Sequence, residues 1–320
     1  MRRGVGTALA GAAAVTVVAA VGYGVLTNGG PLRPFANECT ATVEGHSVDL
    51  TLEQAESAAL ITAISVRRGL PARAASIALA TAYQESDLYN VDYGDRDSLG
   101  LFQQRPSQGW GSEQEVLDPV YATNAFYDAL MNVDGYEALE ITVAAQEVQR
   151  SGFPDAYADH EADARAIASA LTGNSPEGFS CEIDDDAESA DTALLDTGLT
   201  KRADVVRREA LGMFGDLPVG GFAPGGVSTG HIPGSAHYEG RAVDLFFRPI
   251  NADTNKRGWA VTHYLMAQAD RLDIKTIIFD DRIWTASRSD QGWRDYDAPS
   301  GPGDRQILEH RDHVHVDVAG

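Results

Sequence analysis

The sequence predicts a multi-domain protein with an N-terminal membrane helix, an all-α domain and a C-terminal α+β domain. Three observations predict this division: an uncharged run near the N-terminus, helix signals at short intervals from Thr51, and alternating helix and strand patterns after residue 199. The expected boundaries are 1–30 for the membrane or signal segment, 40–181 for the helical domain, 182–198 for an acidic linker and 199–320 for the last domain.

The amino-acid composition argues against two classes of binding partner. The 320 residues include 25 Lys and Arg against 47 Asp and Glu, for a net charge of −22, and 43% are hydrophobic. Nucleic acids and anionic lipid surfaces require clustered cations, so neither is expected as the main partner. The hydrophobic fraction argues against global disorder.

Residues 4–26 contain no charged side chain. At ~1.5 Å per residue the run is long enough for a helix to cross a hydrocarbon core of ~30 Å. Arg2 and Arg3 precede it and the next basic residue is Arg33, which predicts a single-pass protein in the cell membrane with its bulk extracytoplasmic. The mild hydrophobicity leaves a cleaved signal peptide, and hence a secreted protein, as the alternative.

The two cysteines, Cys39 and Cys181, flank the helical domain. Outside the reducing cytosol such a pair usually forms a disulfide bond. Closing the loop between them stabilises a fold by about 4–5 kcal/mol in the chain-entropy model. Two unrelated buried thiols are the alternative.

Helix signals divide residues 40–181. Thr51 begins a capping box, Pro71 suits the first turn of a second helix, and Asp118 precedes Pro119 as the cap of a third. Two more helices are expected from Thr142 and from Pro154. Residues 90–111 are rich in Gly, Asp and Gln and are expected to form a long loop, and the acidic run 182–188 indicates a solvated linker.

The last domain alternates helices with strands. Helices are expected over 200–214 and 256–272, and strands over 242–247, 276–279 and 314–318. In the final strand a period of two puts His313 and His315 on one face and the valines in the core.

His237, Asp244 and His315 form a candidate zinc site. His237 lies in an expected loop, and Asp244 and His315 lie on expected strands. Hydrolytic zinc needs two or three nitrogen or oxygen ligands and an open position for water. The alternative is a polar sheet face without metal, and we assign His231, His263 and His310 to such ordinary packing.

The pattern Ser235-x-His237-x6-Asp244, with a late Asp312-x-x-His315, resembles the zinc D-Ala-D-Ala carboxypeptidase (hedgehog-type) superfamily, in a wall-associated subgroup. The resemblance implies zinc ligation by His237, Asp244 and His315, Asp312 as general base, His313 acting on the transition state, and Ser235 in substrate binding. Strand alternation points Asp312 away from His315, so it is expected at the strand entrance. The stretch 220–223 lacks the arginine that such carboxypeptidases carry, which favours endopeptidase or amidase cleavage.

Glu85 marks a second candidate site. It ends an apolar helix, where burial can raise a carboxyl pKa enough for general acid catalysis near neutral pH. An ordinary exposed helix acid is the alternative. Glu85-Ser86 followed by Gly100-Leu101-Phe102-Gln103 resembles lytic transglycosylases and goose-type lysozymes, which implies a lysozyme-like fold, Glu85 as general acid and then base, and Gln103 in sugar binding.

Some features near Glu85 have no settled role. The Tyr-Asn element common in that family is not evident, although Gln149, Arg150 and Tyr157 lie near its expected place. A second carboxylate and sugar-stacking rings have several candidates: Asp92, Asp95 and Asp97, and Tyr89, Tyr93 and Trp110.

Both resemblances point to one polymer. The resulting hypothesis is an exported, membrane-tethered peptidoglycan hydrolase that cuts glycan with Glu85 and peptide with a Zn²⁺-dependent site at His237, Asp244 and His315. Peptidoglycan is the expected partner, with the membrane contacted through residues 4–26 and no nucleic acid. The alternative is a non-catalytic wall-binding or scaffold protein that retains both folds.

Overall fold

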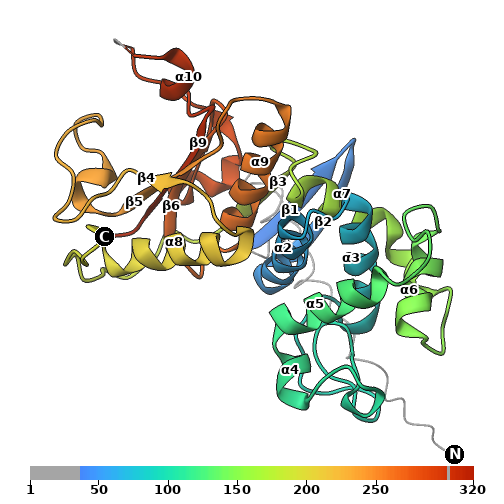
Figure 1. Ribbon diagram of the computed structural model, residues 1–320. Coiled ribbons are helices and arrows are strands. Elements are labelled where there is room, and N and C mark those ends of the chain that lie inside the picture. The colour runs from blue at the N-terminus through green and yellow to red at the C-terminus, as the bar shows by residue number, and fades with distance from the viewer. Residues whose placement is uncertain (1–36, 301–302) are drawn as a thin grey trace, which may run out of the picture. The chain divides into compact units, whose positions relative to one another are not determined.

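Two antiparallel sheets organise the chain in a computed structural model that describes residues 37–300 and 303–320 (Figure 1). The smaller sheet has the order β2-β1-β3 and the larger one the order β4-β5-β9-β6-β7-β8. Residues from Asn37 to the C-terminus form one compact unit.

The small sheet corrects the prediction of an all-α, lysozyme-like domain. It consists of β1 (Glu38–Val43), β2 (His46–Thr51) and β3 (Phe179–Glu182). Polar and apolar residues alternate in β1 and β2, and Glu44 and Gly45 turn between them with positive φ angles of 52° and 85°. The sequence predicts regular structure only from the helix cap at Thr51, whereas β1 and β2 precede that cap and end at it. This half therefore combines a β-sheet with helices.

The predicted disulfide is confirmed: Cys39 and Cys181 are bonded. They are direct partners across β1 and β3, and both side chains are buried. The bond therefore ties the start of the N-terminal half to the strand that ends it.

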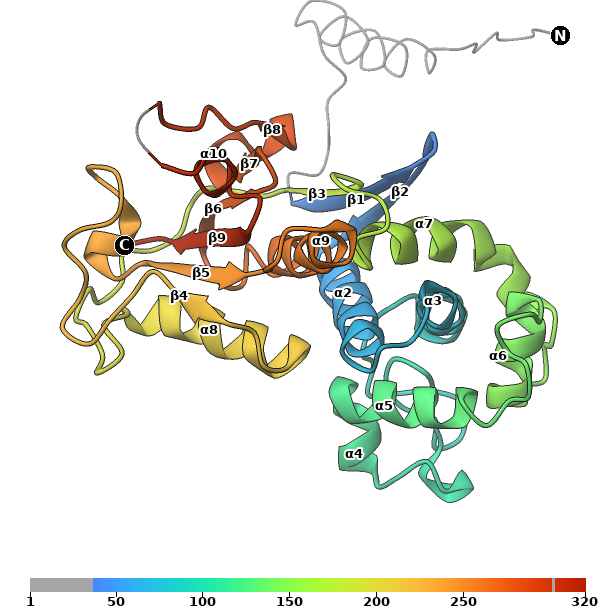
Figure 2. The ribbon, with the colours of Figure 1, turned by 45° about the horizontal axis from the view of Figure 1, so that its top comes forward.

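Helices of the N-terminal half gather around α3, which packs against α2, α5, α6 and α7 (Figure 2). Thr51 and Gln54 form a capping box at the start of α2, and Asp118 caps α5, as the sequence predicts. The elements are α2 (Leu52–Arg67), α3 (Ala72–Ser86), η1 (Pro106–Gln108), α4 (Glu113–Leu117), α5 (Pro119–Leu130), α6 (Ile141–Gln149), η2 (Ala156–His160) and α7 (Glu161–Leu171).

The C-terminal half places two helices, α8 and α9, against the larger sheet. Its helices are α8 (Lys201–Phe214), η3 (Ala236–Glu239), α9 (Ala252–Ala267), η4 (Ala286–Gln291) and α10 (Arg305–Leu308). Its strands are β4 (Val219–Gly220), β5 (Ala242–Phe246), β6 (Ile274–Phe279), β7 (Arg282–Thr285), β8 (Arg294–Asp295) and β9 (His313–Val318). In the β5–β9 ladder Asp244 lies opposite His315.

Helix α9 joins the two halves into a shared core, since it packs on β6 and β9 and also on α2, α7 and β3 (Figure 2). Every residue from Gly258 to Ala267 is buried, as expected for a helix covered on all sides. Side chains of the C-terminal half also hydrogen-bond to carbonyl oxygens of the β3 segment: the Nε1 atoms of Trp293 and Trp284 donate to Phe179 and Cys181 at 2.9 and 3.0 Å.

The acidic segment after β3 contacts the folded body. Lys275 pairs with Asp185, and Arg202 donates to the carbonyl oxygen of Glu188 at 3.2 Å. The division of the chain at residues 182 and 198 stays a prediction.

The predicted transmembrane helix and single-pass location in the cell membrane require correction. Within residues 37–300 and 303–320, no helix has both the length and the apolar character needed to span a bilayer. The segment 4–26 on which the prediction depended lies outside the described residues. We do not carry the membrane assignment forward.

Candidate functional site

The structure brings His237 together with Asp244 and His315 of the larger sheet. His237 lies on η3, whose first turn is capped by Ser235, because the Ser235 hydroxyl accepts from the backbone N–H of His237. Asp244 and His315 are cross-strand partners on β5 and β9. All three side chains are at least 92% buried, with exposed fractions of 2%, 6% and 8%.

The spacing of their donor atoms fits a small cation. His237 Nε2 lies 3.1 Å from Asp244 Oδ1 and 3.0 Å from His315 Nδ1, and His315 Nδ1 lies 3.2 Å from Asp244 Oδ1. Ligands bound tetrahedrally to zinc at about 2.0–2.1 Å are about 3.3 Å apart, close to these distances. Two imidazoles and one carboxylate are also a donor set that zinc accepts in hydrolytic sites.

Each histidine is held by a second contact on its other ring nitrogen. His237 Nδ1 lies 2.8 Å from the carbonyl oxygen of Gly221, and His315 Nε2 lies 3.3 Å from Asp317 Oδ2. Such contacts orient metal-binding imidazoles and fix their tautomers. Gly221 must lack a side chain here, because a Cβ atom would lie 2.3 Å from His237 Cε1 and 2.8 Å from Asp244 Oδ2.

Electrostatics in the cluster favour positive charge. Burial acts to raise the pKa of Asp244, but hydrogen bonds with His237 and His315 outweigh it and hold this pKa well below its usual range. Burial acts to lower the pKa of His315, but Asp244 and Asp317 outweigh it and raise the pKa to about 9. The negative charge of the two carboxylates therefore converges on the place where the ligand atoms meet.

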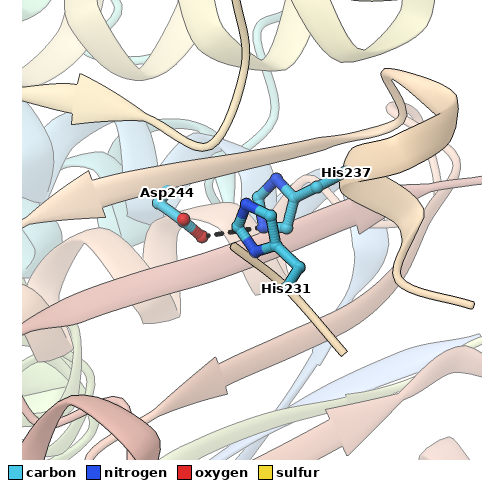
Figure 3. A group of neighbouring side chains, drawn as sticks. All are labelled: His231, His237 and Asp244. Atoms are coloured by element: carbon cyan, nitrogen blue, oxygen red, sulfur yellow. Dashed lines mark ion pairs between the residues drawn. The ribbon is translucent and has the colours of Figure 1, made fainter. Parts of the chain in front are cut away.

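The structure adds His231, which the sequence interpretation assigned to ordinary packing. Its ring stacks on that of His237 with centroids 3.9 Å apart and planes at 22° (Figure 3). Donor atoms of His231, His237 and Asp244 all lie within 4.8 Å of one another. The usable sequence signal was its position in a glycine-rich loop just before the Ser235 motif, since loops often carry functional residues.

Asp312 and His313 form a bonded pair beside this cluster. His313 Nδ1 lies 2.7 Å from Asp312 Oδ1, and the Nε atom of Arg248 donates to Asp312 Oδ2 at 2.6 Å. Asp312 directly precedes β9, at the predicted strand entrance, and His313 Nε2 lies 3.9 Å from Asp244 Oδ1. Burial acts to raise the pKa of Asp312, but His313 and Arg248 outweigh it and lower the pKa. Arg248 was not identified from the sequence.

A cavity of about 500 Å³ opens beside these residues. Its wall includes Ser235, Arg248 and the exposed apolar side chains of Ile232 and Ile307. His310 also lines it, 4.5 Å from the ring of His313 between centroids, and burial with the charge of nearby histidines lowers the pKa of His310 to about 3. Ser235 thus borders the cavity, but its hydroxyl oxygen already accepts a hydrogen bond in the capping of η3.

Glu85 lies in a separate cleft of about 1220 Å³ in the N-terminal half. It occupies the last turn of α3 and is half-buried. Burial raises its pKa, while hydrogen bonds from Tyr157 and Gln149 act to lower it. The Tyr157 hydroxyl donates to Glu85 Oε1 at 2.6 Å. A carboxyl group with a raised pKa beside a large cleft has the properties of a general acid.

The predicted sugar-binding residue Gln103 lines the same cleft as Glu85. Its φ angle is 46°, and its side-chain amide donates to the carbonyl oxygen of Tyr93 at 3.1 Å. Trp110 and Asp95 line the cleft as well. Asp97 is instead tied to Arg105 at 2.8 Å, which makes it a structural anion of the loop.

Comparisons with known proteins give one partial match. Residues 196–306 match the model of the VldE C-terminal domain, which covers about a third of the chain. The matched segment contains His231, His237 and Asp244 and ends before His315. The comparison with curated proteins gives no match. The resemblances of residues 40–181 to lytic transglycosylases and of the last domain to the hedgehog-type superfamily therefore stay predictions.

Proposed function

We propose that the C-terminal half is a metal-dependent peptidase whose Zn²⁺ is held by His237, Asp244 and His315. The observation that carries this proposal is the triangle of donor atoms with sides of 3.0, 3.1 and 3.2 Å in a buried, electronegative position. Bound there, Zn²⁺ would supply Lewis-acid polarisation of an amide carbonyl and activation of water.

The residues beside the proposed metal centre have separate roles in the reaction. His313 directs Nε2 toward the cluster while Asp312 holds its Nδ1 atom, so we assign His313 to contact with the reacting groups. Asp312 orients that imidazole, and Arg248 holds Asp312. A base acting directly from Asp312 would first have to break one of these bonds, because both of its carboxylate oxygens are engaged.

The substrate class that fits this site is a peptide with a mixed apolar and polar surface. Ile232 and Ile307 offer apolar contacts in the cavity, while Arg248 presents a half-exposed guanidinium. Among the described residues that line the cavity, Arg248 pairs with Asp312 and Arg241 pairs with Glu239, so neither arginine is dedicated to a terminal carboxylate. This favours cleavage within a peptide over removal of its last residue. The stem peptide of peptidoglycan is our proposed substrate.

A second activity is favoured by the cleft around Glu85. We assign Glu85 the role of general acid in glycan cleavage, supported by its raised pKa and by the size of the cleft. Gln103 and Trp110, on the cleft wall, would contact the sugars. Glycan strands and stem peptides belong to the same polymer, so peptidoglycan as the partner unites the two sites.

Metal analysis of the full chain tests the peptidase proposal. We expect about one zinc per chain, lost in His237→Gln and Asp244→Asn, and peptide cleavage of purified peptidoglycan lost with it. His46→Gln is the matched control, because His46 lies on β2 and pairs with Asp163 instead. A folded wild type that takes up no zinc contradicts the proposal.

Muropeptide release from purified wall tests the glycan activity. Glu85→Gln should abolish it, whereas Glu147→Gln, an exposed acid in the same cleft, should retain it. Equal release by both variants contradicts the role of Glu85. Wall binding by the wild type without any product identifies instead a non-catalytic wall-binding protein.

A further inference from the structure

His231 lies on a glycine-rich loop that differs from the elements holding the other ligands. Gly225, Gly226, Gly230 and Gly234 surround it with φ angles of 80°, 89°, 96° and 81°. The loop has no strand or helix between β4 and η3. His231 is half-buried, whereas the three ligands of the proposed centre are buried on the sheet and η3.

The loop is attached at His231 through one side chain. Tyr238 accepts from the backbone N–H of His231 at 3.0 Å and donates to the backbone carbonyl oxygen of the same residue. The backbone is thereby positioned, while the imidazole makes no hydrogen bond to any other described residue and lies against the ring of His237 (Figure 3). Its nitrogen atoms are thus free to bind a cation.

The donor atoms of His231 are less closely grouped with those of the other residues than these are with one another. His237, Asp244 and His315 have donor atoms 3.0–3.2 Å apart, close to the spacing around one ion. The group that includes His231 is looser, with its donor atoms within 4.8 Å of one another. Because its ring is stacked on that of His237, the His231 imidazole would have to turn as well as move with its loop to reach that spacing.

We propose that His231 is a fourth, exchangeable ligand of the cation, which closes the centre at rest and yields its place to an incoming ligand. This inference rests on the proposed metal centre. Zinc with four protein ligands is typical of closed structural sites, whereas hydrolytic sites keep one position open. A histidine on a glycine-rich loop allows one chain to adopt both states, and it lowers the apparent affinity for substrate by the fraction of molecules in which the position is closed.

Two binding measurements on the full chain test this with opposite expected directions. In His231→Ala, Zn²⁺ affinity from chelator competition should fall about 3- to 10-fold, because one ligand is lost. Acetohydroxamate affinity for the Co²⁺-loaded protein should rise about 3- to 10-fold, because no protein ligand has to be displaced. Tyr238→Phe releases the backbone of His231, so it should change the two affinities in the same directions as His231→Ala but by smaller factors. His46→Ala should change neither affinity.

The outcomes separate the inference from the proposed function. Unchanged affinities in His231→Ala overturn the fourth ligand, and so does a fall in both affinities, since that marks a merely structural role. If the wild type binds neither Zn²⁺ nor Co²⁺, the metal centre itself fails. Opposite shifts of the two affinities support exchange at His231, because general damage to the site does not strengthen inhibitor binding.

Discussion

Tyr157 donates a 2.6 Å hydrogen bond to Glu85 across a sequence separation of 72 residues. The tyrosine belongs to η2 and is almost fully buried, whereas the glutamate ends α3. Its hydroxyl stabilises the ionised carboxylate and so opposes the effect of burial on the pKa of Glu85. The pair sets how far the pKa of the proposed acid departs from its ordinary value.

Replacing Tyr157 with Phe should shift the pH profile of glycan cleavage. Loss of a hydrogen bond to the carboxylate raises the pKa of Glu85 further, by about one unit if the bond is worth about 1.4 kcal/mol. A general acid is active while protonated, and a higher pKa keeps it protonated to higher pH. The alkaline limb of kcat/KM should therefore move up by about one pH unit, measured as muropeptide release from pH 4 to 9.

Tyr136→Phe is the control for that shift, because Tyr136 is a half-buried tyrosine with no contact to Glu85. Its profile should coincide with that of the wild type. An alkaline limb that stays in place in Tyr157→Phe, or moves to lower pH, contradicts the assignment of Glu85 as the titrating acid.

Local signals account for the parts of the fold that the sequence predicts well. The caps at Thr51 and Asp118 involve residues three or fewer positions apart, so their hydrogen bonds can be inferred from the sequence. The pairing of β1 with β3 includes Cys39 and Cys181, 142 positions apart, and only these two cysteines indicated it in the sequence. Short strands with polar alternate positions give weaker signals than capped helices, which explains the missed sheet.

In the candidate metal centre, too, some residues can be identified from the sequence and others depend on long-range contacts. His237, Asp244 and His315 were identified from motif spacing and strand alternation, and the structure brings them together. Arg248 meets Asp312 across 64 positions and has no motif of its own. His231 depends on the path of a glycine-rich loop, which composition does not determine. The sequence therefore identifies the three proposed ligands, whereas the residues that support them depend on tertiary contacts.

Arg248→Gln should lower peptide turnover while leaving the cation in place. Arg248 contacts Asp312 and lies outside the donor triangle, so we expect kcat to fall about 10- to 100-fold and Zn²⁺ affinity to stay within about 3-fold. Its effect should not add to that of Asp312→Asn, because the two residues act through one orientation of His313. Steady-state kinetics and chelator competition on the two single variants and the double variant provide the measurement.

Arg288→Gln, at an exposed position on η4, is the control and should match the wild type. Additive losses in the double variant indicate that Arg248 acts on the substrate independently of Asp312. A loss of zinc in Arg248→Gln assigns it to the integrity of the centre instead of the positioning of His313.

Gly221→Ala should weaken cation binding through steric contact alone. The added Cβ would lie 2.3 Å from His237 Cε1 and 2.5 Å from its Nδ1, so the imidazole must move. We expect Zn²⁺ affinity to fall at least about 10-fold by chelator competition, as for losses of supporting contacts around metal ligands. Gly215→Ala is a matched control, since its φ of 78° equals that of Gly221 within a degree, nothing lies within 4 Å of its Cβ, and it lies at the end of α8. Both variants strain the backbone, so equal zinc affinities would show that the contact with His237 is unimportant.

Removing the disulfide should destabilise both halves together. Cys181 lies in β3, whose segment also accepts hydrogen bonds from Trp284 and Trp293 of the C-terminal half. Replacing Cys39 and Cys181 with Ala removes a restraint on the unfolded chain and so increases its conformational entropy. The free energy of unfolding should fall by about 2–5 kcal/mol, measured by urea denaturation.

Far-UV circular dichroism and tryptophan fluorescence should report one common transition in that variant, because α9 and the β3 contacts join the halves into a shared core. The wild type under a strong reductant should approach the same midpoint. A loss below about 1 kcal/mol would mean that the contacts of β3 with β1 and with the two tryptophans hold the strand without the covalent bond. Two separated transitions would instead contradict the shared core, since each half would then unfold around its own sheet.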